Sequence, residues 1–310
     1  MTTSTRRMFL QASALGVTLG ARQLLADETT TTTAATGQTD AHPGANQVAI
    51  LNDTHIGEDQ GSDHAHPTNL RAAVAYLLEL PSRPSAVVIN GDLAMSVGTP
   101  GDYQSFKRWI EPLREAGLKL YLTLGNHDDR DEFLKHFDDL QSASRLAEHR
   151  HNGILDLPQA KLILLDSLKE TPASPGRLGD EQIAWLLAEI DRQPDKPVVL
   201  VAHHNPRLGG DAAHFPGGLE DTEALWSELL LRKQVKCYFH GHVHDWSLGM
   251  HFGIHIVNTL ASSMVANKAV STNGWTMATF GKEGVELELH TYLPDHPWNG
   301  ERKWLYWRLK

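Results

Sequence analysis

Five short hydrophobic runs in the chain each end in residues that can bind a metal ion. They lead into the blocks Asp53-Thr54-His55, Gly91-Asp92, Gly125-Asn126-His127-Asp128, His203-His204 and His240-Gly241-His242-Val243-His244. Short apolar runs are typical of buried strands, and open α/β sheets bind ligands beyond the carboxyl ends of their strands. The pattern therefore predicts that these side chains meet at one edge of a sheet. Oxygen and imidazole ligands together favour Zn, Mn, Fe or Ni over Ca or Mg.

Charge and cysteine content limit the classes of function. The 310 residues carry a formal net charge of −10, which argues against binding a nucleic-acid polymer or an anionic membrane through charge. A small anionic substrate held by metal ions remains compatible with this charge, because bound cations dominate the local field. The single cysteine, Cys237, excludes an intrachain disulfide and is expected to be a buried core thiol.

The first residues have the features of an export signal. Arg6-Arg7 precedes an uncharged stretch over residues 8–21, and Ala26 follows shortly after it. This start resembles a twin-arginine signal, and the apolar stretch is too short to span a bilayer comfortably. We therefore expect a signal peptide at 1–26, the twin-arginine export machinery as a partner, and a periplasmic or extracellular location. No cysteine stands directly after the apolar stretch, so no stable membrane anchor is expected.

The rest of the chain divides into a linker and one domain. Residues 27–46 are rich in Thr, Ala and Gly, which predicts a disordered linker. From residue 47 strands alternate with predicted helices at 69–80, 103–116, 132–146, from 180 and at 222–231, with a strand pair at 154–157 and 162–165. After His244 only strands are predicted, at 254–259, 275–280 and 285–292. This order predicts an α/β fold over 47–310, with two packed sheets flanked by helices and a strand-rich C-terminal segment.

The order of the five blocks resembles that of the calcineurin-like metallophosphoesterases. Asp-x-His, Gly-Asp, Gly-Asn-His-Asp, His and Gly-His-x-His follow one another between Asp53 and His244. The resemblance implies a β-sandwich of mixed sheets with helices on both faces and a two-metal centre. The Asp53-Thr54-His55-Ile56 block and the His203-His204 pair look most like the class III cyclic-nucleotide and glycerophospho-diesterases.

The resemblance also implies which residues bind the two metal ions, with Asp92 in the bridging position. The first ion would be bound by Asp53, His55, Asp92 and His244. The second ion would be bound by Asp92, Asn126, His203 and His242. The ions are expected to be divalent or mixed-valence Mn, Fe, Zn or Ni. Pattern alone leaves open whether His203 or His204 is the ligand, and His203 is preferred as the first of the pair before the Asn205-Pro206 turn.

Two more residues of the third block are expected to act in catalysis. In the family, the histidine at the position of His127 contacts the phosphate and can protonate the leaving oxygen, which suits an imidazole pKa near neutrality. Asp128 is expected to orient His127. His64 and His66 lie in the loop where relatives line the substrate entrance, so they are candidates for substrate contact.

These residues imply an exported binuclear metal-dependent phosphodiesterase. Its small substrate would be a cyclic nucleotide or a glycerophosphodiester, cleaved by attack of metal-bound hydroxide. The alternative is a phosphomonoesterase of the same fold. Purple acid phosphatases are disfavoured because they carry a tyrosine where Met95 stands and Asp-x-Gly where this chain has His55. A remote alternative is a non-catalytic exported metal-binding protein, although no ligand of the pattern is lost.

The aromatic C-terminal segment allows two interpretations. Trp298, Trp304, Tyr306 and Trp307 fall within ten residues. They would cover the core, or they would form the surface of a homodimer or a cap over the substrate.

Overall fold

The computed structural model describes residues 44–140, 146, 150–208, 217–269 and 271–309. The predicted signal peptide and residues 27–43 of the predicted linker lie outside these residues. The last three linker residues, 44–46, belong to the folded domain, because the Gly44 carbonyl accepts hydrogen bonds from Ser85 and the Asn46 carbonyl accepts one from the Phe280 amide at 2.9 Å. Within the described part, no helix combines the length and apolar character needed to cross a membrane.

The first of two six-stranded sheets contains the strand ends of the first three blocks. Its strand order is β12 (Arg302–Tyr306), β11 (Gly284–Thr291), β10 (Gly274–Phe280), β1 (Gln47–Asn52), β2 (Ala86–Asn90) and β3 (Lys119–Thr123). The strands β1, β2 and β3 are parallel, whereas β10, β11 and β12 extend the sheet in antiparallel fashion.

The second sheet contains the strand ends of the two histidine blocks. Its strand order is β4 (Gly153–Asp156), β5 (Lys161–Leu165), β6 (Val198–Ala202), β7 (Val235–His240), β9 (Ile254–Asn258) and β8 (Ser247–His251). The four central strands are parallel, and the edge strands β4 and β8 are antiparallel to their neighbours. Both sheets are therefore mixed, as predicted.

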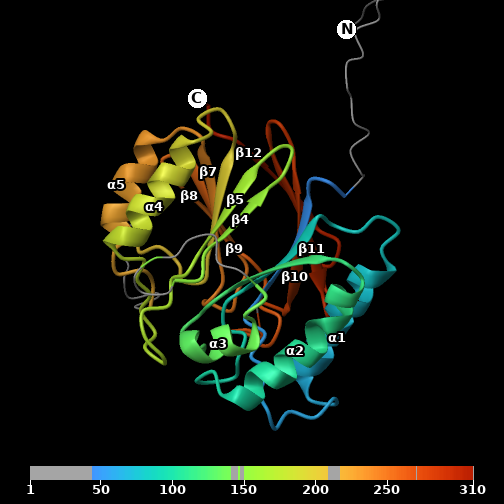
Figure 1. The fold of residues 1–310 in the computed structure, drawn as a ribbon. Coiled ribbons are helices and arrows are strands. Elements are labelled where there is room, and N and C mark those ends of the chain that lie inside the picture. The colour runs from blue at the N-terminus through green and yellow to red at the C-terminus, as the bar shows by residue number, and fades with distance from the viewer. Residues whose placement is uncertain (1–43, 141–145, 147–149, 209–216, 270, 310) are drawn as a thin grey trace, which may run out of the picture. The chain divides into compact units, whose positions relative to one another are not determined.

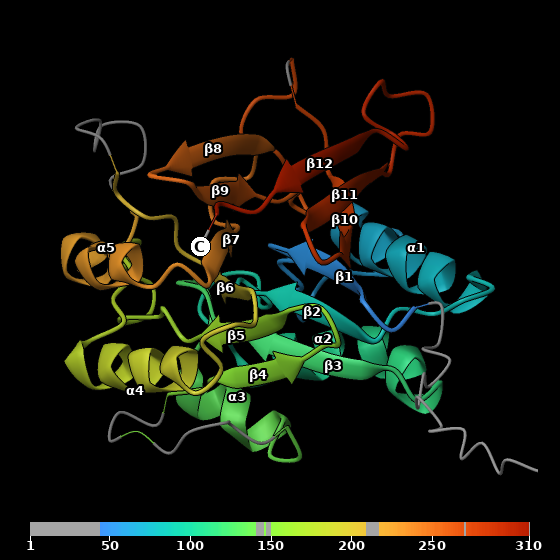
Figure 2. The same ribbon diagram turned by 90° about the horizontal axis from the view of Figure 1, so that it is seen from above.

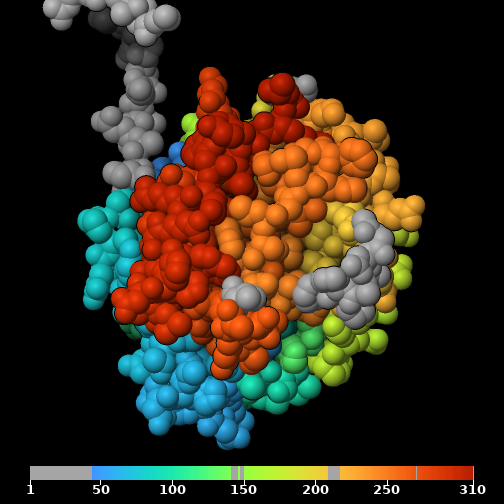
Figure 3. Space-filling view, turned by 180° about the vertical axis from the view of Figure 1, so that it is seen from behind, coloured from blue at the N-terminus to red at the C-terminus, as the bar shows by residue number. Residues whose placement is uncertain are grey.

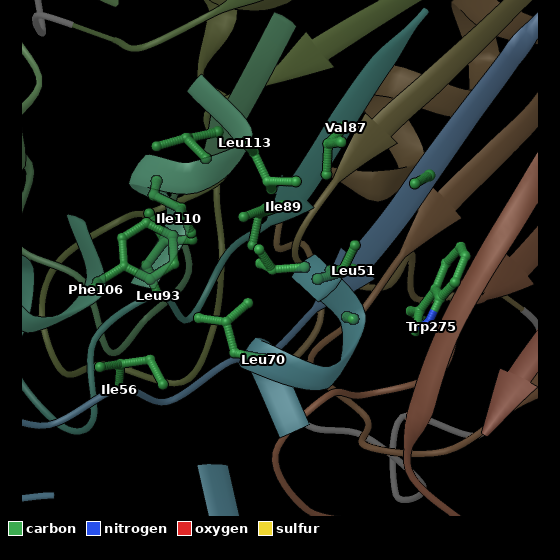
Figure 4. Packing of buried hydrophobic residues seen from close by; sticks show 14 of the residues in the cluster. Leu51, Ile56, Leu70, Val87, Ile89, Leu93, Phe106, Ile110, Leu113 and Trp275 are labelled. Carbon is green, nitrogen blue, oxygen red and sulfur yellow. The ribbon is translucent and has the colours of Figure 1, made fainter. Parts of the chain in front are cut away.

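Helices cover the outer face of each sheet and give a four-layer arrangement (Figure 1, Figure 2). The first sheet is covered by α1 (Ala65–Glu79), α2 (Pro100–Glu115) and α3 (Arg130–His136), and the second by α4 (Asp180–Asp191) and α5 (Thr222–Leu231). Figure 4 shows Leu70 of α1 and Phe106 of α2 pointing toward Leu51 and Ile89 of the first sheet. A separate apolar cluster fills the space between the two sheets.

The central strands are buried on both faces, which explains their unbroken hydrophobic runs. In β1, Val48 and Ile50 belong to the cluster between the sheets, whereas Ala49 and Leu51 belong to the cluster under the helices. Strands that are covered on both faces have no position that favours a polar side chain. The polar residues therefore begin where the strands end.

Helix α3 is shorter than predicted, because it ends at His136 whereas the pattern indicated residue 146. The next residues include Asp138 and Asp139, and carboxylates at a helix C-terminus oppose the helix dipole. Residues 141–145 and 147–149 of the predicted helix lie outside the described part.

Two edge strands, β8 and β12, were not predicted. The β8 side chains are mostly exposed, and the strand has only five residues, two of them large and apolar. Within β12, Trp304 and Tyr306 are exposed, whereas the neighbouring Trp307 packs against the cluster between the sheets. The aromatic segment therefore covers the core only in part.

The loop between β8 and β9 combines an exposed aromatic residue with unfavourable backbone geometry. It consists of Phe252 and Gly253, with φ angles of 47° and 82°. Two-residue loops with positive φ at both positions favour Asn-Gly, and a bulky residue is strained there.

We predict that Phe252→Asn stabilises the protein. The Phe252 side chain is 76% exposed, so little packing is lost, and relief of the left-handed strain should contribute about 1 kcal/mol. The melting temperature should rise by about 2–4 °C. Phe252→Ala is the control, because it removes the ring without adding the short polar side chain that lets asparagine adopt a positive φ. An equal rise in both variants would contradict the explanation.

Candidate metal centre

Two groups of histidine and aspartate side chains meet beyond the strand ends of the two sheets. One group contains Asp53, His55, Asp92 and His244, and the other contains His203, His204 and His242. Within each group the candidate ligand atoms lie within 4.8 Å of one another. Asp92 connects the groups, since its Oδ2 lies 3.5 Å from His55 Nε2 and 3.4 Å from His203 Nε2.

The backbone is left-handed at most of these positions. Six described residues other than glycine have a positive φ, and five of them are predicted ligands: Asp53, His55, Asp92, His242 and His244, with φ from 46° to 68°. Non-glycine residues in this region cost about 1–3 kcal/mol each, and such strain clusters at functional sites. The structure therefore holds these side chains in conformations that local preference disfavours.

Glycines next to three of the ligands provide the space for close approach. A Cβ atom at Gly125 would collide with the Asp92 carboxylate and would lie 2.7 Å from His203 Nε2. A Cβ atom at Gly91 would collide with the His203 ring, and one at Gly241 would lie 2.6 Å from Asp53 Oδ2. These glycines therefore allow strand ends from both sheets to share one small volume.

Backbone carbonyl groups fix the orientation of three imidazole rings. His55 Nδ1 lies 3.3 Å from the Met95 carbonyl, His203 Nδ1 3.2 Å from that of Asn90, and His127 Nδ1 3.0 Å from that of Ser96. A ring that donates its Nδ1–H to a carbonyl presents Nε2 as the ligand atom.

The neutral amide oxygen of Asn126 indicates that these residues suit a metal ion. Its Oδ1 is buried and has no hydrogen-bond partner among the described residues. A buried acceptor without a partner destabilises a fold by about 1–3 kcal/mol. A divalent ion bound to this oxygen would remove that cost, so the residues fit a metal centre.

Burial and neighbouring charges determine the protonation of the side chains at the site. Burial alone would raise the pKa of Asp92, but His203 and His55 outweigh burial and hold this pKa well below its usual range. Burial lowers the pKa of His55 and of His242 to about 4. Asp92 is thus ionised and His55 and His242 are neutral, which are the forms that bind metal ions. At His203 burial is outweighed by the Asp92 carboxylate, which raises the pKa of the ring to about 9, so this ring would release a proton when an ion binds.

Asp128 has a different role from the one predicted. Its carboxylate accepts hydrogen bonds from the amides of Leu93, Ala94 and Gly125 at 2.9–3.2 Å and from the Tyr103 hydroxyl at 3.2 Å. His127 is oriented by a carbonyl group instead. The prediction that Asp128 orients His127 is therefore wrong, because the buried carboxylate is taken up by the amides that hold the Asp92 loop against the Asn126 loop.

The structure brings both histidines of the fourth block into the site. His203 lies next to Asp92, whereas the Nδ1 of His204 lies 2.8 Å from the Ser167 hydroxyl. The His204 and His242 ring centroids are 4.7 Å apart. The sequence pattern left open which of the two histidines is the ligand and preferred His203, whereas the structure places both rings in the cluster.

The two histidines of the entrance loop have structural partners. His66 is buried, and its Nδ1 lies 2.9 Å from the His55 carbonyl. His64 precedes α1 and accepts a hydrogen bond from the His66 amide, so it caps that helix. His66 thus supports the segment that carries His55, and His64 is the more exposed of the two.

The site matches a known family of enzymes. The family model of the calcineurin-like phosphoesterases matches residues 47–246, which include all five blocks. The chain belongs to this family. With the clustered ligand groups, membership identifies a metal-dependent phosphoric ester hydrolase and indicates a binuclear metal centre with a small phosphoester substrate.

Family members with assigned activities are similar to most of the chain. A probable cyclic nucleotide phosphodiesterase of Rhodococcus erythropolis is 27% identical and covers 78% of both chains. A cAMP/cGMP dual specificity phosphodiesterase of Mycobacterium tuberculosis is 28% identical and covers 82% of this chain and 78% of its own length. A glycerophosphodiester phosphodiesterase of Enterobacter lignolyticus is 30% identical over 56% of this chain and 61% of its own.

A solved structure confirms the fold. A dimetal phosphatase from Danio rerio superposes with a TM-score of 0.64 over 86% of this chain and 100% of its own. The sequence identity is only 15%, so the shared property is the arrangement of sheets and helices.

We predict that Gly125→Ala prevents assembly of the metal centre. The added methyl group would displace Asp92 and His203, so metal per chain and activity should fall at least tenfold while the fold survives. Gly117→Ala is the control, because a Cβ there meets no atom within 4 Å, and the positive φ of Gly117, which Gly125 does not share, makes it the more strained backbone position of the two. Metal analysis and calorimetry of both variants check this prediction, and full metal content in Gly125→Ala would contradict it.

Proposed function

We propose that the enzyme is a phosphodiesterase that hydrolyses cyclic nucleotides or glycerophosphodiesters. The observation that carries this proposal is the similarity to phosphodiesterases over about four-fifths of the chain. The Asp53-Thr54-His55-Ile56 block and the His203-His204 pair support the same subgroup. The alternative is a phosphomonoesterase of the same fold.

We further propose a ligand set for each of the two metal ions. Asp53, His55, Asp92 and His244 would bind the first ion. Asp92, Asn126, His203 and His242 would bind the second. The mixture of carboxylate, amide and imidazole ligands favours Mn, Fe, Zn or Ni. Two such ions would supply Lewis acidity and activated water for in-line displacement at phosphorus.

In this proposal His127 acts on the substrate rather than on a metal ion. Its amide donates a hydrogen bond to Asp92 Oδ1 at 2.9 Å, and its ring contacts the His55 ring at a centroid distance of 4.9 Å. The ring is partly exposed, unlike those of His55 and His203. With Nδ1–H donated to the Ser96 carbonyl, uptake of a second proton at Nε2 gives the imidazolium, and its Nε2–H would be the proton that the leaving oxygen accepts.

The proposal predicts a preference for diesters over monoesters. With Mn present, kcat/KM should be higher for bis(p-nitrophenyl) phosphate than for p-nitrophenyl phosphate, and at least one cyclic nucleotide or glycerophosphodiester should be hydrolysed. Asp92→Asn should lose metal and both activities, which controls for contaminating enzymes. A clear preference for the monoester, with no natural diester cleaved, would favour the phosphatase alternative.

The role of His127 predicts an effect that depends on the leaving group. His127→Ala should keep both metal ions and should lose about 10²–10⁴-fold in rate on substrates with alkoxide leaving groups, because a general acid is lost. The loss should be much smaller for nitrophenolate, which leaves without protonation. His136→Ala is the control for removal of an imidazole outside the site. Loss of metal from His127→Ala would make His127 a ligand.

We also propose that the enzyme is exported by the twin-arginine route to the periplasm or the extracellular medium. The Arg6-Arg7 pair before a short apolar stretch supports this. Replacement of both arginines by lysine should leave the precursor in the cytoplasm, as measured by cell fractionation. Unchanged export of the double variant would reject the proposal.

A further inference from the structure

A cavity of about 360 Å³ lies beside the metal centre on the second sheet. Three of its polar residues stand at or just beyond strand ends: Asn205 after β6, His240 at the end of β7 and Asn258 at the end of β9. Val243, between the proposed ligands His242 and His244, also lines the cavity. The cavity therefore borders the loop that carries two of the proposed ligands.

The cavity lies on the face of the second sheet that turns away from the first. Ile254 and Ile256 of β9 pack with the cluster under α4 and α5. Asn258 lies two residues after Ile256 in the same strand, so it belongs to the same face of the sheet. In the register of the sheet, Asn258 lies opposite His240 of β7 on one side and opposite Ser247 of the edge strand β8 on the other. Figure 3 shows the orange segment that contains β8 and β9 at the surface, beside the red C-terminal strands.

Two carboxamides in this cavity have unsatisfied hydrogen-bonding groups. Asn258 is 1% exposed, and neither its Oδ1 nor its Nδ2 has a hydrogen-bond partner among the described residues. The Oδ1 of Asn205 is likewise buried and without a partner in that part of the chain. Buried polar groups in native proteins are nearly always paired, so each exception requires an explanation. A ligand that offers both a donor and an acceptor would explain them.

The walls of the cavity indicate the chemical class of that ligand. Leu208, Val243 and Ile256 give it apolar surface, and Met250 is 61% exposed on its rim. A methionine thioether makes favourable contacts with aromatic rings. A polyol such as glycerol has no apolar face to match these walls, whereas a flat heterocycle has one. The volume is within the range of small-molecule sites.

We propose that this cavity binds the adenine base of a nucleotide substrate. The Asn258 carboxamide would accept a hydrogen bond from the N6 amino group and donate one to the adjacent ring nitrogen, which is the pairing that Asn makes with adenine. Asn205 would offer a further acceptor. The inference rests on the proposed phosphodiesterase function, and it selects cyclic adenine nucleotides over glycerophosphodiesters as the substrate class.

The first test compares two cyclic nucleotides that differ only in the 6-amino group. The holoenzyme should hydrolyse 3′,5′-cyclic AMP about 10- to 100-fold more efficiently, by kcat/KM, than the 3′,5′-cyclic phosphate of purine riboside, which lacks this group. In Asn258→Leu the ratio should fall to about one. Asn299→Leu, a carboxamide removed from the connection between β11 and β12, should keep the ratio of the unchanged enzyme.

The second test measures binding without turnover. Adenosine should bind the holoenzyme in calorimetry, and Asn258→Leu should weaken this binding by about the same factor. Gly249→Leu should fill the cavity from β8 and weaken adenosine binding as well. A Cβ atom at Gly249 meets its nearest neighbour, Ile256, at 3.9 Å, so this variant should fold even if Asn258→Leu does not.

The outcomes separate this inference from the proposed function. Hydrolysis of bis(p-nitrophenyl) phosphate with no effect of the 6-amino group and no adenosine binding would overturn the adenine site alone. Full adenosine affinity in folded Asn258→Leu and Gly249→Leu would overturn it too. Failure to hydrolyse any diester would overturn the phosphodiesterase, and adenosine binding would then report on the cavity by itself.

Discussion

The structure depends on the requirement that polar side chains from five strand ends share one small volume. Left-handed backbone at five proposed ligand positions costs about 1–3 kcal/mol per residue, so the sum is of the same order as the net stability of about 5–15 kcal/mol that is usual for a domain. The three buried apolar clusters stabilise the strands that impose this geometry. The buried core therefore supplies the stability that the strained backbone at the edge of the sheets requires.

Asp128 shows how the strained edge is held together. Its carboxylate accepts hydrogen bonds from backbone amides of the loop after β2 and of the loop after β3. These hydrogen bonds fix the distance between Asp92 and Asn126. Burial, together with the nearby Asp92 carboxylate, raises the pKa of Asp128 to about 7. The hydrogen-bond donors that converge on this carboxylate offset its unfavourable electrostatic environment. Asp128 thereby holds together the two loops that carry Asp92 and Asn126.

Much of the fold could be predicted, because strands that are buried on both faces appear in the sequence as unbroken hydrophobic runs. The helix Thr222–Leu231 was predicted with the bounds that the structure has, since it is an apolar segment with polar flanks. The edge strand β8 could not be predicted, because its side chains face solvent and its turn contains Phe252. In the site, side chains with metal-binding chemistry were identifiable. The Met95 and Ser96 carbonyls were not, because every residue carries a carbonyl and only the folded chain selects these two.

The proposed ligands come from both sheets, and this has a consequence for the lifetime of the protein. Asp53, Asp92 and Asn126 follow strands of the first sheet, whereas His203, His242 and His244 follow strands of the second. Ions bound between them would crosslink the two halves of the sandwich at one edge. By mass action, each tenfold rise in free metal above the dissociation constant would stabilise the folded state by about 1.4 kcal/mol. Resistance to proteolysis would then follow the metal supply of the surroundings, so that scarcity would remove the protein as well as its activity.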